Sequence, residues 1–153
     1  MKFLNKTILG GLIFAISNIQ IDAATNLCFN EIMQSNINAL QLDHDFPDSW
    51  VELYNPTETT IVLDNYFIGT SNSISSAYQI PNASIKAKGY LIIPCDKKGE
   101  NLHTNFRLES VNPGTIYLFN ESGILIDQLS YPTMPAPNIA YGRASDGSEE
   151  WGW

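Results

Sequence analysis

The sequence predicts an all-β domain, built as a sandwich or a barrel of short strands. After the first two dozen positions, runs of β-branched and aromatic residues alternate with clusters of turn residues. No stretch there keeps the 3.6-residue hydrophobic period of an amphipathic helix. At 153 residues the chain fits one domain, which would bury roughly two thirds of the surface of its unfolded state.

The strand-like runs are short and are separated by turn residues. In chain order they cover residues 27–33, 50–54, 60–63, 66–70, 77–80, 90–94, 115–119 and 124–131. The clearest pair is the last one, because Gly123 supplies the positive φ that a three-residue hairpin loop requires before the returning strand. The sequence therefore predicts a β-hairpin at this position.

The strand WVELY places a carboxylate between two aromatic residues. Its period of two sends Val51 and Leu53 to one face, and Trp50, Glu52 and Tyr54 to the other. A carboxylate in this setting is partly removed from water. An arginine that binds it through two hydrogen bonds is then the expected companion.

Three interpretations of Glu52 stay open: a catalytic acid, a metal ligand, or a structural partner of Arg143 or Arg107. The structural ion pair is favoured, with Arg143 as the partner, because perturbed carboxylates often belong to such pairs.

The first residues are typical of a secretory signal peptide. Lys2 and Lys6 precede the apolar run ILGGLIFAI, and the small residues Ala23 and Ala24 follow it. We expect a signal peptide of residues 1–24 and a mature domain of residues 25–153. The apolar run has about half of the ~20 residues that a membrane-spanning helix needs, so we expect no transmembrane span after cleavage.

The net charge limits which classes of partner the protein can bind, and the two cysteines raise the question of a disulfide. The formal net charge is −8, and the few basic residues are scattered along the chain, which argues against a nucleic-acid partner. Cys28 and Cys95 both lie in apolar runs. In an oxidising compartment a disulfide between them is allowed. Two buried free thiols are the alternative, because a disulfide requires Cα atoms within ~7 Å of each other.

A loop with three aspartates, Asp43, Asp45 and Asp48, invites a calcium hypothesis, since hard cations bind several oxygens. The spacing does not fit an EF-hand, whose sixth and twelfth positions would fall on Asp48 and Tyr54. A solvated acidic loop is favoured over an irregular calcium loop.

Other catalytic and metal patterns are absent from the sequence. His44 and His103 are far apart and no Cys-x-x-Cys occurs, which argues against zinc. No Gly-x-Ser-x-Gly occurs either. We therefore expect no catalytic residue, no cofactor and no bound metal.

Several motifs together resemble the bacterial lamin-tail domain family, over residues 29–151 and in the family's order. They are FNEIMQSN, DSWVELYNPTETTIVLDNYFIG, IKAKGYLIIPCDK, LHTNFRLES, TIYLFNESGILIDQLSY and AYGRASDGSEEW. The resemblance implies an immunoglobulin-like β-sandwich and an exported module that mediates binding or attachment, with no catalytic residues to carry over. Cys95 departs from the family's pattern, and the chain stops at Trp153 where family members generally continue.

We therefore expect a non-enzymatic module exported to the periplasm, the cell surface or the medium of a bacterium. It would bind a protein or a surface glycan, with Tyr54, Trp151 and Trp153 as contacts, because aromatic residues commonly anchor interfaces. The alternative is that Trp50 and Tyr54 pack under a loop, and that the segment Trp151-Gly152-Trp153 is a strand that docks on the sheet. Two other functions stay open: an accessory domain of a longer secreted hydrolase or nuclease, and a calcium-stabilised structural domain.

Overall fold

The computed structural model describes residues 27–42 and 44–153. The predicted signal peptide lies outside the described residues, as does Asp43. The elements in chain order are β1 (Cys28–Met33), β2 (Trp50–Tyr54), β3 (Ile61–Val62), β4 (Phe67–Gly69), the 3₁₀ turn η1 (Ile74–Ser76), β5 (Tyr78–Gln79), β6 (Ser84–Ile85), β7 (Tyr90–Pro94), β8 (Gly114–Phe119), β9 (Leu125–Tyr131), β10 (Tyr141–Arg143) and β11 (Trp151–Gly152).

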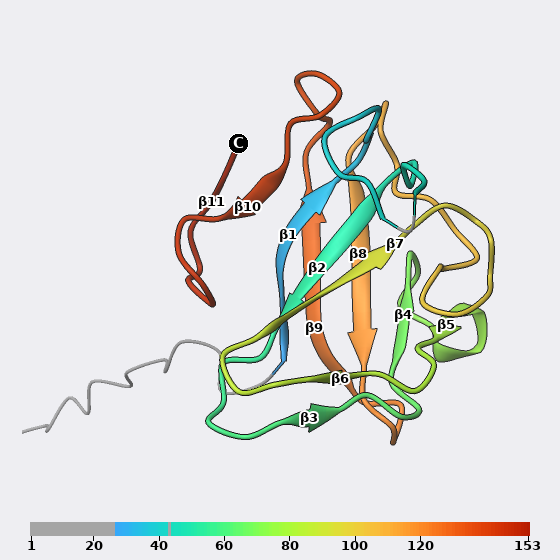
Figure 1. Cartoon of the computed structure of the whole chain (residues 1–153), viewed down its shortest axis with the longest axis vertical. Helices are drawn as coiled ribbons and strands as arrows, with labels where there is room; N and C mark the ends of the chain where they lie inside the picture. The colour runs from blue at the N-terminus through green and yellow to red at the C-terminus, as the bar shows by residue number, and fades with distance from the viewer. Residues whose placement is uncertain (1–26, 43) are drawn as a thin grey trace, which may run out of the picture.

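These strands form two antiparallel sheets that face each other. The first sheet has the order β11-β10-β1-β2-β7, and the second has the order β5-β4-β8-β9. Strands β3 and β6 form a separate two-stranded sheet. In Figure 1, β1, β2 and β7 cross in front of β8 and β9, and the β10–β11 pair extends away from the other strands at one side. The predicted all-β fold is confirmed, and the architecture is an immunoglobulin-like β-sandwich.

Each predicted strand overlaps a strand of the structure, and 50–54 and 90–94 have the predicted boundaries. The hairpin is also confirmed. Strands β8 and β9 pair antiparallel, the φ of Gly123 is +74°, and its N–H donates to the Asn120 carbonyl at 2.9 Å. Strands β6 and β10 were not predicted, and β11 was considered only as an alternative. They span two or three residues each and lack an apolar alternation, so only pairing with neighbouring strands marks them.

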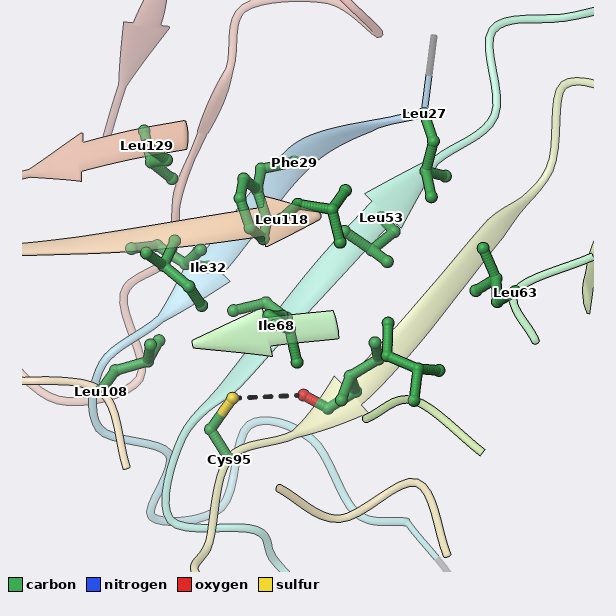
Figure 2. Packing of buried hydrophobic residues seen from close by; sticks show 14 of the residues in the cluster. Leu27, Phe29, Ile32, Leu53, Leu63, Ile68, Cys95, Leu108, Leu118 and Leu129 are labelled. Carbon is green, nitrogen blue, oxygen red and sulfur yellow. Dashed lines mark hydrogen bonds between the residues drawn. The ribbon is translucent and has the colours of Figure 1, made fainter. Parts of the chain in front are cut away.

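The core lies between the two sheets. Phe29 and Ile32 of β1 are both fully buried although they are three residues apart, because the β1–β2 register shifts between Phe29 and Glu31. Such a bulge changes which side chains face inward. Figure 2 shows Phe29 and Ile32 near Leu53 of β2 and Leu118 of β8, which belong to the same buried cluster. Burying one such side chain stabilises the fold by about 1.5–3 kcal/mol.

Candidate functional site

Glu52 lies on the outward side of the five-stranded sheet. Its neighbours across the sheet are Glu31 of β1 and Ile92 of β7, and the Asn30 side chain donates to Glu52 Oε1 at 3.0 Å. The predicted alternation holds, because Val51 and Leu53 are fully buried on the core side. Glu52 therefore faces another carboxylate rather than an arginine.

The predicted ion pair between Glu52 and Arg143 is wrong. Gly142 pairs with Glu31 on the outward side, so the next residue, Arg143, projects to the opposite side. Its Nε donates to the Phe29 carbonyl at 2.6 Å, and Nη2 lies 3.7 Å from an oxygen of Asp127.

Further contacts hold Arg143 on the core-facing side. Its guanidinium also donates to the Ser148 carbonyl and lies 4.7 Å from the centre of the Trp151 ring. The other candidate partner of Glu52, Arg107, pairs instead with Asp48.

Asp127 takes the structural role that the sequence predicted for Glu52. This β9 carboxylate accepts the Phe29 N–H at 2.8 Å and faces Arg143, so it links the second sheet to β1 and β10. Burial raises the pKa of Asp127, and the Phe29 N–H and the Arg143 charge oppose that rise only in part. No sequence pattern distinguished Asp127, because its partners come from two distant strands.

The aromatic residue Tyr54 is not an exposed contact residue. It is 8% exposed, and its ring centre lies 5.1 Å from that of Tyr90. The prediction that Tyr54 contacts a partner is therefore wrong, and the alternative that it packs within the domain is correct. Tyr90 donates from its hydroxyl to Asp146, and this hydrogen bond, more than burial, raises the pKa of Tyr90 to about 12.

The two tryptophans near the end of the sequence lie together on the β10–β11 pair. The ring centres of Trp151 and Trp153 lie 5.5 Å and 4.9 Å from that of Tyr141. Trp151 is partly buried against the core, whereas Trp153 is 48% exposed. The alternative that this segment docks on the sheet as a strand is correct for Trp151 and Gly152, and Trp153 keeps the exposure that a contact residue needs.

A groove of about 500 Å³ adjoins this aromatic cluster. It is lined by Glu31, Ala140, Gly142, Arg143, Ala144, Glu150, Trp151, Gly152 and Trp153. Sequence reasoning found Trp151 and Trp153 but missed Glu31 and the glycines. The signal for the glycines was the alternation of small residues in Ala140-x-Gly142-x-Ala144, which marks a strand face without bulky side chains.

Of the two alternatives for Cys28 and Cys95, the pair of buried free thiols is correct and the disulfide is not. Both thiols are free and buried. Cys28 lies opposite Tyr54 at one end of β2, whereas Cys95 follows Pro94, which lies opposite Trp50 at the other end. At about 3.4 Å per residue this separation exceeds the ~7 Å that a disulfide tolerates between Cα atoms. Figure 2 shows the Cys95 thiol directed toward a carbonyl oxygen, that of Ile93.

The aspartates of the calcium hypothesis have other partners. Asp45 pairs with Lys98 at 2.9 Å and Asp48 pairs with Arg107, while Asp43 lies outside the described residues. Across residues 27–42 and 44–153, no group of three or more His, Cys, Asp or Glu side chains is placed to hold a metal ion. The described part of the loop therefore gives the calcium hypothesis no support.

A charge network centred on the buried Asp96, which the sequence did not predict, holds two loops together. The Asp96 side chain is only 4% exposed, and one of its oxygens lies 2.7 Å from His103 Nδ1 and 3.2 Å from Lys98 Nζ. Burial alone would raise the pKa of Asp96, but its hydrogen bonds with His103, Lys98 and the backbone hold the pKa below the usual value. The neighbouring Thr104 hydroxyl donates to the Phe106 carbonyl, so it is not aligned with the histidine as a nucleophile.

Within the described part of the chain, no helix has the length and apolar content needed to cross a membrane.

Comparison with known proteins identifies the family. A sequence model of the Lamin Tail Domain family matches residues 20–133, which include β1 to β9. A search of curated proteins found no match. Lamin tail domains are immunoglobulin-like domains commonly involved in protein interactions. The extent of the match and the observed sandwich agree, and the chain belongs to the lamin tail domain family.

Proposed function

We propose that this protein is an exported, non-catalytic module that binds a protein partner, with the β10–β11 groove as the contact surface. The observation that carries the proposal is Trp153, whose large ring is half exposed beside a groove while its neighbour Trp151 packs onto the domain. A rigid aromatic side chain at the rim of a hollow is a common anchor of protein interfaces.

Two further features support this location. The Tyr141 ring, which itself stacks on Trp151, contacts the Trp153 ring from one side, so little side-chain freedom would be lost when a partner covers Trp153. Strand β11 also lies at the end of its sheet, so the groove is open at that edge. Export rests on the N-terminal sequence pattern, and the absence of catalysis rests on the lack of a recognisable catalytic motif.

Binding of the labelled protein to cells of its host tests the contact surface. Trp153→Ala should weaken binding about tenfold or more, as is typical when an aromatic anchor is truncated. The matched control is Val111→Ala, because Val111 is another strongly exposed apolar residue, at 74%. Equal binding by wild type and Trp153→Ala would contradict the proposed surface.

Export is tested separately by the intact mass of the protein isolated from its host. A chain that begins near residue 25 is expected, because the signal peptide would have been removed. A mass that retains residues 1–24 would contradict export by this route.

A further inference from the structure

The floor of the β10–β11 groove is bare backbone. Gly142 of β10 and Gly152 of β11 face each other across the pair of strands, on the same side as Glu31. A Cβ added to Gly152 would meet nothing within 4 Å, which shows open space above it. A Cβ added to Gly142 would lie 3.2 Å from the Glu31 Cγ, so the Glu31 side chain borders this floor.

The groove also has an excess of negative charge. Glu31 and Glu52 lie directly opposite each other on β1 and β2, and neither has a basic partner within 4.0 Å among the described residues. Glu150 lines the same groove. Like charges in directly opposed positions destabilise a sheet, so a cation placed here would offset an existing repulsion.

The one basic residue that lines the groove does not supply that cation. Arg143 donates to the carbonyls of Phe29 and Ser148, faces Asp127 and covers the Trp151 ring. Its charge is therefore directed to the core-facing side of the strand, and the outward side keeps its unpaired carboxylates.

We propose that the groove receives an arginine or lysine side chain from an extended segment of a partner protein. The aliphatic stem would lie on the backbone of Gly142 and Gly152, and the cationic end would pair with Glu31. Long basic side chains combine an apolar stem with a charged end, which matches a bare floor bordered by a carboxylate. This inference rests on the proposed function and specifies the chemistry of its partner.

Fluorescence anisotropy with labelled peptides tests the proposal on the chain without its signal peptide. The probe is a short peptide in which arginine alternates with threonine, and the comparison peptides carry glutamine or glutamate in place of arginine. The arginine peptide should bind, more weakly at higher salt, and the other two should not. Failure of the arginine peptide to bind would overturn the proposal.

Two variants locate the binding. Glu31→Gln removes the charge at nearly constant volume and should weaken peptide binding about five- to tenfold. Gly152→Val fills the open space above the floor and should weaken binding by at least as much, while the unfolding temperature shows that the domain still folds. The control is Glu121→Gln, an exposed acid at the tip of the β8–β9 hairpin, which should bind like wild type.

The outcomes separate the two proposals. If Trp153→Ala abolishes binding to host cells while Glu31→Gln leaves arginine-peptide binding unchanged, the groove remains a contact surface and the basic-side-chain proposal is overturned. If neither Trp153→Ala nor Glu31→Gln changes any binding, both proposals fail. Equal weakening by Glu31→Gln and Glu121→Gln would indicate only nonspecific attraction to an acidic protein, and would also overturn the proposal.

Discussion

At the scale of single residues, Glu31 has an unusual position, because its placement lowers the stability of the free protein. It faces Glu52 across two strands and is half-buried. Burial, followed by the charge of Glu52, raises the pKa of Glu31 above its ordinary value of 4.5. Folding therefore favours the neutral carboxyl, and this contribution to stability is present at low pH and is lost as the pH rises through the raised pKa.

Glu31→Gln should therefore stabilise the protein at neutral pH. The neutral amide removes the repulsion from Glu52, which is worth roughly 0.2–1 kcal/mol for like charges in directly opposed positions of a sheet. Thermal or urea unfolding at neutral pH measures the change, with Glu121→Gln as the exposed control. A clear loss of stability would mean that Glu31 has a structural partner, and would remove the argument that its charge is available for binding.

At the scale of elements, the sequence predicted those strands whose own residues alternate or form an apolar run. The hairpin β8–β9 was predictable because Gly123 and the flanking runs are local signals. Strand β10 was not, and β11 was only an alternative, because both form only by pairing with β1 or with each other. For the same reason Trp153 could be named as a contact residue, whereas Glu31 could not, since the groove exists only once β10 has paired with β1.

The pairing of Asp96 with His103 and Lys98 joins two loops. We expect this junction to make the free energy of unfolding depend on pH in the acid range. Lys98 also pairs with Asp45, so the network links Asp45 to the segment that follows β7. Since the pKa of Asp96 is below its ordinary value of 3.8, its stabilising contribution is fully present above that value and is lost as the pH falls through the lowered pKa.

Asp96→Asn should lower the free energy of unfolding at pH 7 by about 1–3 kcal/mol, because the charge-assisted network loses its buried central acceptor. Below the ordinary pKa of Asp96, the variant should lose less stability with falling pH than wild type does. Urea unfolding across this pH range measures both effects, and Asp64→Asn is the control at an exposed turn. Parallel pH curves for wild type and Asp96→Asn would show that this network does not govern acid stability.

At the scale of the whole molecule, Cys28 and Cys95 lie near opposite ends of β2. The rate at which a reagent modifies each thiol therefore measures how readily the sandwich opens at that end. Burial raises the pKa of Cys28 to about 11, with the Arg143 charge opposing the rise, and burial raises that of Cys95 to about 12. The reactive species is the thiolate, so burial suppresses alkylation twice, by excluding the reagent and by keeping the proton on sulfur. Both thiols belong to the sandwich itself, and neither lies in an exposed loop.

The native protein should therefore resist iodoacetamide at both cysteines and should show the same unfolding temperature with and without a reductant. In denaturing urea both thiols should be alkylated, and intact mass counts the labels. At intermediate urea the labelling rate of the two sites should follow the global unfolding equilibrium, because each thiol is exposed only when the sandwich opens. Rapid labelling of Cys28 alone would instead show that β1 detaches locally, and with β1 the Glu31 border of the groove would become a mobile surface.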